Sequence, residues 1–245
     1  AGGILGPKHA EALIEFGATV VLTDHNEDKV IEKAEILNKK YGEGSAIPLY
    51  MDVVKRDTII AVAEQLDKVD ILVNNAAKDP KVEDSKGMTP SSRFESATLH
   101  GTFLCSQVFA NKMLENGGGT IVNIASCLAN IAPDQRIYRQ DGLEEDMQNV
   151  KPITYVASKW AVVGMTKYLA TYFAERGIRV NCLSPTGVWN ERIPEHMVQR
   201  ISSLNPMNRM AHIDEYKGAI VFLASDASSY MTGTNLVIDG GKTSW

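Results

Sequence analysis

The sequence predicts one doubly wound α/β domain over residues 1–245, in which helices cover both faces of a parallel sheet. Apolar runs of strand length alternate with longer segments of helical periodicity. A glycine-rich segment stands directly before the first of these helices. Hydrophobic residues make up 44% of the 245, which is enough for a sizeable core in a single domain of this class.

The alternation can be followed along the whole chain. Helices are predicted at 7–16, 27–40, 55–66, 91–115, 153–175 and 213–224. Strands are predicted at 18–23, 45–51, 69–73, 120–126 and 178–183, with a last edge strand within 233–241. Residues 78–90 are polar and are expected to form a loop. The helix at 27–40 is expected to bury Val30, Ile31, Ala34 and Leu37.

Charge and composition exclude several classes of partner. The net charge of −5 and the pI near 5.6 argue against nucleic acid, which usually requires a basic face. No apolar run approaches the roughly 20 residues that span a bilayer, and no signal peptide opens the sequence. Cys105, Cys127 and Cys182 lie in apolar stretches without metal-ligand spacing. We therefore expect a cytoplasmic protein with reduced core cysteines, no metal and no membrane partner, with a nucleophilic Cys127 as the weaker alternative.

The start of the sequence is typical of a dinucleotide site. Gly2, Gly3, Ile4, Leu5 and Gly6 precede Pro7, which suits a first helical turn. Glycines let the backbone approach a pyrophosphate, and the helix end supplies unpaired N–H groups. An ordinary flexible terminus is the alternative interpretation.

Asp24 ends the next strand, 18 positions after Gly6, where such a fold binds the adenosine ribose hydroxyls. Asp24 could instead cap the following helix. In the first case, the residues after Asp24 offer no fixed cation, so the predicted cofactor is NAD rather than NADP.

The candidate catalytic residues lie in the second half of the chain. Tyr155 and Lys159 are four residues apart, so they share one face of the helix at 153–175. A free phenol has a pKa of about 10, and a nearby ammonium favours the phenolate, which could then exchange protons with a substrate. A surface tyrosine and lysine without function are the alternative. Ser126 ends the buried strand at 120–126, at the sheet edge where doubly wound folds place reactive groups.

Together with the segment Asn74-Asn75-Ala76-Ala77, these residues make the sequence similar to the short-chain dehydrogenase/reductase family. The resemblance implies a Rossmann-like fold in which Ser126 bonds the substrate oxygen, Tyr155 transfers a proton and Lys159 holds the nicotinamide ribose. It also implies a homotetramer or homodimer. Further cofactor contacts implied by the resemblance are Asp52, Val53, Asn75, Ala76, Ala77, Pro185, Gly187 and Val188. Asp52 could equally cap a helix.

In that family a complete strand and a Thr-Gly pair precede the position of Ala1. We therefore expect the sheet to be short of its first strand and the glycine-rich motif to be short of its start. Two other positions depart from the family pattern. Thr98 stands where an Asn is usual, and Thr186 replaces a glycine.

Two segments beside the site have open roles. Residues 128–154 lengthen the separation of Ser126 from Tyr155, and they either select the substrate or form a solvated surface excursion. Residues 189–212 are expected to form a lid over the substrate, whereas simple core packing is the alternative. This segment contains Trp189, Met197, Met207 and Met210.

The predicted function is an NAD-dependent oxidoreductase that interconverts a secondary alcohol and a ketone, with a polyol or sugar derivative as the suggested substrate. A catalytically impaired NAD-binding sensor or scaffold is the alternative from another class. A nucleotide-sugar dehydratase or epimerase would need a carboxyl-terminal substrate domain, for which the sequence has no room. Apolar residues on more than one face of the helices at 91–115 and 153–175 support assembly. They include Phe103, Leu104, Trp160 and Val163.

Overall fold

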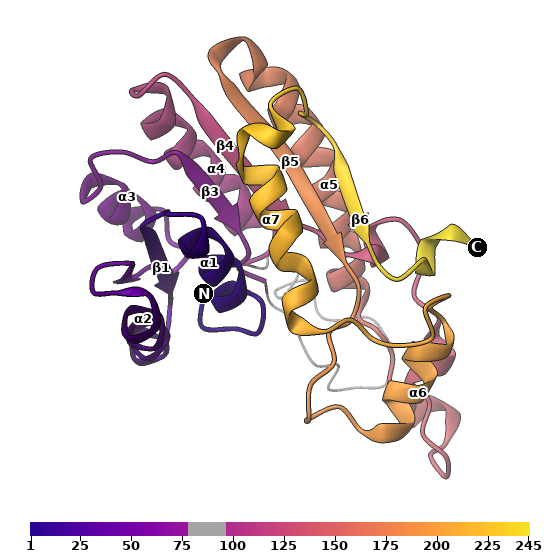
Figure 1. Cartoon of the computed structure of the whole chain (residues 1–245). Coiled ribbons are helices and arrows are strands. Elements are labelled where there is room, and N and C mark those ends of the chain that lie inside the picture. Colours follow the sequence, from indigo (N-terminus) through magenta and orange to yellow (C-terminus); the bar gives the residue numbers. More distant parts are fainter. Residues whose placement is uncertain (78–96) are drawn as a thin grey trace.

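Parallel strands form the middle layer of the protein. The computed structural model describes residues 1–77 and 97–245. A four-stranded sheet has the order β3 (Ile71–Asn74), β4 (Gly119–Ile124), β5 (Ile178–Pro185), β6 (Asn235–Ile238), and a two-stranded sheet contains β1 (Val20–Asp24) and β2 (Ala46–Tyr50) (Figure 1). All ladders are parallel. The Rossmann-like α/β prediction is therefore confirmed.

Among the described strands, β1 does not pair with β3, so the parallel ladder is in two parts. Side chains connect these parts. Val20 of β1 and Ile71 and Val73 of β3 pack against one apolar cluster, whose centre includes Val122 and Leu183.

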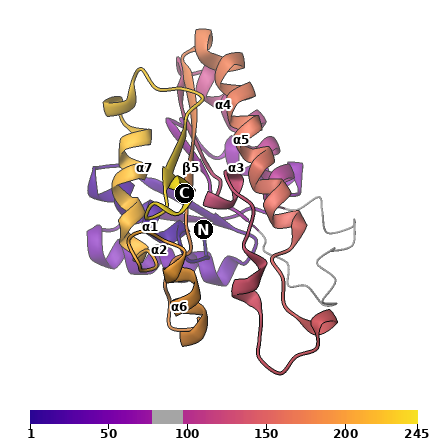
Figure 2. The same ribbon diagram turned by 90° about the vertical axis from the view of Figure 1, so that its right-hand side faces the viewer.

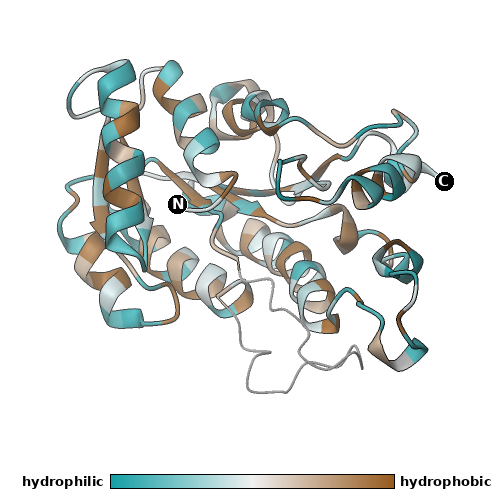
Figure 3. Ribbon diagram, turned by 90° about the horizontal axis from the view of Figure 1, so that it is seen from below, coloured by the Kyte–Doolittle hydropathy of each residue, from teal (hydrophilic) through white to brown (hydrophobic). Residues whose placement is uncertain are grey.

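Helices cover both faces of this layer (Figure 2). One face carries α1 (Gly6–Glu15), α2 (Glu27–Tyr41) and α7 (Lys217–Ala224), and the other carries α3 (Arg56–Glu64), α4 (Leu99–Leu114) and α5 (Ile153–Phe173). Most helices are hydrophilic on one side and hydrophobic on the other (Figure 3). Strands β4 and β5 are almost wholly buried because helices pack on both of their faces. Within the described residues, no helix combines the length and the apolar character needed to cross a membrane.

The predicted elements are found with small differences in their bounds. The helix predicted at 91–115 begins at Leu99 in the described part, where residues 97–98 form a turn. Residues 91–96 and the loop predicted at 78–90 lie outside the described residues. The helix predicted at 213–224 begins instead as a 3₁₀ helix, η6 (Ile213–Tyr216). There the Glu215 carboxylate accepts the backbone N–H of His212 at 2.7 Å and tightens the first turn. Ile31 was expected in the core but is 39% exposed.

The segment between Ser126 and α5 contains three short 3₁₀ helices: η2 (Cys127–Ala129), η3 (Gln135–Tyr138) and η4 (Glu145–Met147). It runs beside α6 (Glu195–Ser203) at the end of the molecule where the strands of the larger sheet finish (Figures 1 and 2). Helix η3 contacts α6, and the Arg200 guanidinium donates a hydrogen bond to the carbonyl oxygen of Arg139. The segment is thus packed against α6 rather than projecting alone.

Candidate active site

The three candidate catalytic residues meet where β4 ends and α5 begins. The Lys159 ammonium donates a 2.7 Å hydrogen bond to the carbonyl oxygen of Ile124, the last residue of β4. Ser126 follows two residues later and is buried. Lys159 Nζ also lies 5.8 Å from the centre of the Tyr155 ring. The buried Lys159 ammonium therefore lies near both the end of β4, two residues before Ser126, and the ring of Tyr155.

Ser126 is held by its own backbone turn. Its Oγ accepts the N–H of Leu128 at 3.2 Å, and Ser126 is the N-cap of η2. Because Oγ is the acceptor in this bond, its own proton remains available for donation to another oxygen.

A buried amide network supports the strand ends beneath the site. The Asn74 amide donates to Asn123 Oδ1 at 2.8 Å and to Ser106 Oγ at 3.0 Å. The Asn123 amide in turn donates to Thr166 Oγ1 at 2.9 Å. These bonds join β3, β4, α4 and α5, so the Asn74 amide braces two neighbouring strand ends.

The glycine-rich segment lies against Asp24 at the carboxyl end of β1. The Asp24 carboxylate accepts the N–H of Gly2 at 2.8 Å and the N–H of Asn26 at 3.0 Å. Burial alone would raise the pKa of Asp24, but these hydrogen bonds and the Ala1 amino group outweigh it and lower the pKa to about 2. A Cβ at Gly2 would lie 3.2 Å from Oδ2 of Asp24 and 3.1 Å from Cβ of Lys29. Close approach of the segment to Asp24 therefore requires a residue with little or no side chain.

Asp52 and Val53 follow β2. Asp52 Oδ1 accepts the N–H of Val54 at 3.2 Å, whereas the N-cap of α3 is Lys55. Asp52 thus forms a local turn and does not occupy the cap position. Val53 packs tightly against α4, where a Cβ on Gly101 would lie only 2.6 Å from it. After β3, Asn75 is half-buried, while Ala76 and Ala77 are exposed.

Pro185 ends β5, and the residues after it are fixed by the neighbouring strand and loop. The Thr186 N–H donates to the carbonyl oxygen of Ile238 at 3.3 Å, and Gly187 accepts the N–H of Ala211 at 3.3 Å. Val188 pairs with Ala211 in an isolated bridge.

The side chain of Thr186, the departure from the family glycine, contacts Cys127, whose Sγ lies 3.7 Å from Oγ1. Cys105, Cys127 and Cys182 are all free and buried, and burial raises the pKa of Cys105 to about 12.

Among the residues of the expected lid, some are exposed, as a lid requires, and one is packed in the core. Trp189 and Met207 are 47% and 60% exposed, whereas Met210 is buried and belongs to the core. Thr98, the other departure, is buried at the N-cap position of α4.

Sequence reasoning did not single out Lys151. Its Nζ lies 3.7 Å from the centre of the Tyr155 ring, on the segment that precedes α5. Lys151 and Tyr155 are four apart, but Pro152 separates Lys151 from the helix, so helical spacing could not have predicted this contact. The neighbour of Gly2, Lys29, was also missed.

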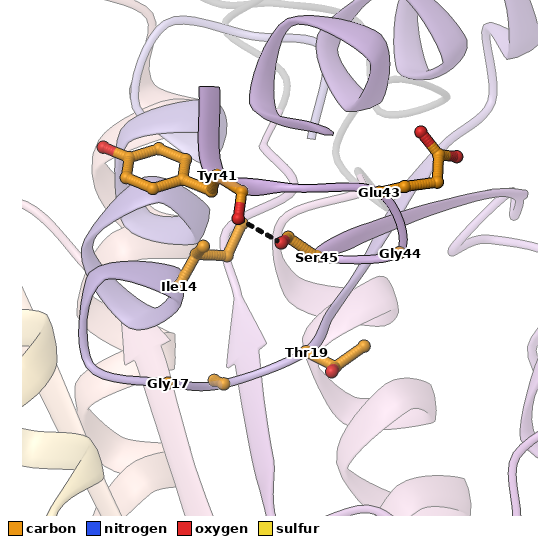
Figure 4. A pocket seen from close by; sticks show the side chains of 8 residues that line it. Ile14, Gly17, Thr19, Tyr41, Glu43, Gly44 and Ser45 are labelled. Carbon is orange, nitrogen blue, oxygen red and sulfur yellow. Dashed lines mark hydrogen bonds between the residues drawn. The ribbon is translucent and has the colours of Figure 1, made fainter. Parts of the chain in front are cut away.

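A pocket of about 320 Å³ lies away from these residues, near the amino ends of β1 and β2 (Figure 4). Gly17, Thr19, Tyr41 and Ser45 are among its lining residues. None of the candidate catalytic residues lines it. In the residues that the structure describes, no group of three or more His, Cys, Asp or Glu side chains is arranged to hold a metal ion.

The residues at the strand ends fit a nicotinamide dinucleotide. Asp24 offers acceptors that suit ribose hydroxyls, and the close approach at Gly2 leaves backbone rather than side chain beside it. Near the end of β4, Lys159 supplies a cation and Ser126 a hydroxyl.

Comparisons with known proteins show which family this chain resembles over its length. The family described as Enoyl-(Acyl carrier protein) reductase matches residues 3–243. The chain is 37% identical over 253 residues to D-threitol dehydrogenase of Mycolicibacterium smegmatis, covering 98% of this chain and 88% of that protein. It is 35% identical over 256 residues to an NAD-dependent glycerol dehydrogenase of Listeria innocua, with 98% and 89% covered.

Among solved structures, a gluconate 5-dehydrogenase from Burkholderia cenocepacia, in complex with NADP and tartrate, superposes with a TM-score of 0.85 at 28% identity. That match covers 100% of this chain and 92% of the other. The sequence motifs, the parallel fold and these relatives lead to one conclusion: the chain belongs to the short-chain dehydrogenase/reductase family.

Proposed function

We propose that this protein is an NAD-dependent dehydrogenase that interconverts a secondary alcohol of a polyol or sugar derivative and the corresponding ketone. The observation that carries the proposal is the Lys159 ammonium, which bonds the end of β4 and lies 5.8 Å from the Tyr155 ring. The relatives named for threitol, glycerol and gluconate support the substrate class. We extend the proposal to a homo-oligomeric, cytoplasmic enzyme on the basis of the family resemblance.

In the oxidative direction, Tyr155 Oη as phenolate takes the proton of the substrate hydroxyl. Ser126 Oγ donates a hydrogen bond to the same substrate oxygen and fixes its position. Lys159 stabilises the phenolate before transfer, because an ammonium near a phenol favours the charged form. Bound NAD would accept the hydride that leaves the carbinol carbon, so the alcohol loses this hydride to the cofactor and one proton to Tyr155 and becomes a ketone.

Asp24 and the glycine-rich segment would hold the adenosine end of the cofactor, and Lys159 the ribose at the other end. The turn after β5, which contains Pro185, Gly187 and Val188, would form the wall beside the nicotinamide. Asp52, Val53, Asn75, Ala76 and Ala77 would complete the adenine side.

The test is a turnover assay with NAD and a panel of polyols and sugar acids, in which the absorbance of NADH is monitored. We expect oxidation of at least one polyol. Tyr155→Phe keeps the ring but removes the titrating hydroxyl, so turnover should fall by about 10²-fold or more while NAD affinity is retained. Near-normal turnover by Tyr155→Phe would contradict the assignment of the acid/base.

A sensor or scaffold without turnover remains the alternative, and it makes a different prediction. Such a protein would bind NAD with normal affinity and oxidise none of the panel. The position of Thr186 weakens this alternative. Its hydroxyl lies against Cys127, and its N–H bonds the carbonyl oxygen of Ile238 on the neighbouring strand β6, so both groups are used within the protein.

A further inference from the structure

Lys151 brings an additional ammonium to the ring of Tyr155. Its Nζ is 3.7 Å from the ring centre, nearer than Lys159 Nζ at 5.8 Å. A cation at this distance is attracted by the negative face of an aromatic ring. The charge of a phenolate is delocalised into its ring, so the same cation attracts the phenolate more strongly than the neutral phenol.

The backbone of Lys151 is fixed by one side chain of the inserted segment. Gln135 Oε1 accepts the N–H of Lys151 at 2.8 Å, and Gln135 Nε2 donates to the Lys151 carbonyl oxygen at 3.4 Å. Gln135 begins η3, which packs against α6. Pro152 then starts α5 with an extended backbone, φ −60° and ψ 137°. The segment thus delivers Lys151 to Tyr155 from outside the helix.

Several charged side chains of the surrounding elements are paired with one another. In the inserted segment, Asp134 bonds Arg136 at 2.7 Å and Arg139 bonds Glu145. Near the start of α7, Arg209 bonds Glu215 at 2.5 Å. Within each of these pairs the opposite charges largely cancel. The ammonium groups of Lys151 and Lys159 lie 3.7 and 5.8 Å from the centre of the Tyr155 ring.

We propose that Lys151 is a positioning residue of the active site, which stabilises the phenolate of Tyr155 together with Lys159 and is held in place by Gln135. This inference rests on the proposed function only in that Tyr155 is the acid/base. It gives the inserted segment a defined role, which is to supply a second cation to the tyrosine. Lys151 is half-buried, so water and salt weaken its effect without removing it.

The first test needs no substrate. The near-ultraviolet phenolate absorbance is titrated in the protein and in its Tyr155→Phe variant, and the difference reports Tyr155 alone. Lys151→Met should raise the midpoint of this titration by about one pH unit, a tenfold change in proton affinity. Lys151→Arg should leave it near the original value, and Gln135→Ala should move it part of the way upward.

Lys39→Met is the matched control, because it removes one exposed ammonium from α2, on the opposite face of the sheet layer. It should leave the midpoint unchanged. Lys151→Gln repeats the charge removal with a polar side chain, in case the methionine variant folds poorly. An unchanged midpoint in a folded variant that lacks the Lys151 charge would overturn the proposal.

The second test uses the pH dependence of kcat/KM. The acidic limb should shift upward in Lys151→Met by the same amount as the titration. A rise in KM without a shift of either curve would overturn the proposal and make Lys151 a substrate ligand instead. If no polyol is oxidised, the proposed function fails, but the titration still decides the role of Lys151.

Discussion

The backbone N–H of Gly2 donates a 2.8 Å hydrogen bond to Oδ2 of Asp24, which joins the glycine-rich segment to the end of β1. Asn26 binds the other carboxylate oxygen. The pKa of about 2 keeps Asp24 ionised throughout the range in which a dehydrogenase works. The Ala1 amino group lies 3.0 Å from Oδ2 and the His25 ring nitrogen 3.1 Å from Oδ1, so a pair of ribose hydroxyls would bind by taking the places of these two contacts.

We expect the protein to prefer NAD to NADP by at least tenfold, or about 1.4 kcal/mol. A 2′-phosphate would place negative charge against Asp24, and NADP sites usually provide an Arg nearby. Lys8 is occupied elsewhere, because its ammonium bonds Glu11 and Asp214, each at 2.9 Å. Dissociation constants for both cofactors, measured at one ionic strength, give the ratio.

Two variants test which residues set the ratio of NAD affinity to NADP affinity. Asp24→Ser combined with Asn26→Arg should narrow or reverse the ratio, because it removes the repulsion and adds a cation. Lys29→Met tests the other lysine beside Gly2, and it should weaken NADP binding more than NAD binding. Equal affinity for the two cofactors in the unmodified protein would show that Asp24 does not select between them.

Glu11 on α1 connects three helices through one buried carboxylate. It accepts hydrogen bonds from Lys40 at 2.6 Å and Tyr41 at 3.0 Å on α2, and it pairs with Lys217 of α7 at 3.6 Å. Burial alone would raise the pKa of Glu11, but the bonds from Lys40, Lys8 and Tyr41 outweigh it and lower the pKa to about 2. The stabilisation is therefore complete above the ordinary value near 4.5 and is lost as the pH falls toward 2.

Glu11→Gln should accordingly lower the free energy of unfolding by about 2 kcal/mol at pH 7, with a smaller difference near pH 3. Urea unfolding at the two pH values measures both. Glu32→Gln is the matched control, since Glu32 pairs with Lys33 on the exposed side of α2 and should change little. A pH-independent loss in the Glu11 variant would mean that its charge does not matter.

We expect a homotetramer or homodimer assembled through α4 and α5. Phe103 and Trp160 are 45% and 50% exposed on these helices, whereas Leu104 is buried in the core, so apolar side chains lie on more than one face of α4. Farther along α5, the rings of Tyr168 and Tyr172 stack at 6.1 Å with more than half of each side chain exposed. Large apolar surfaces of this kind often mark interfaces.

Light scattering should give a mass that is a multiple of 26.8 kDa. Tyr168→Glu with Tyr172→Glu should shift it toward the monomer, because the change buries two charges in the contact. Tyr230→Glu alters a fully exposed tyrosine elsewhere and should leave the mass unchanged. A monomeric mass for the unmodified protein would exclude this assembly.

The sequence predicted features that depend on local pattern, and it missed those that depend on how distant segments pack. Periodicity located the strands and helices, and the spacing of Tyr155 and Lys159 placed them on one helix face. The contact of Lys159 with Ile124 could not be predicted, because it depends on how closely α5 approaches β4. The contact of Lys151 with Tyr155 could not be predicted for a similar reason, because Gln135, which fixes Lys151, lies 16 positions earlier in an irregular segment.

The sequence alone also left open the roles of some residues at the expected cofactor site. Thr186 replaces a family glycine, and its side chain contacts Cys127 inside the protein. Asp52 could have been a helix cap, and the structure gives that position to Lys55. In each case the role of the residue depends on the direction of its side chain, which a pattern of residue types does not show.

The burial of the strands, described above for β4 and β5, has a consequence for local opening of the protein. Strands β1 and β2 bury fewer of their residues than β4 and β5 do. Backbone amides of β1 and β2 should therefore exchange with deuterium through a lower-energy partial unfolding than amides of β4 and β5. Since Asp24 ends β1, a dinucleotide bound there should slow this exchange, so the adenosine half of the site would be the part that a cofactor rigidifies.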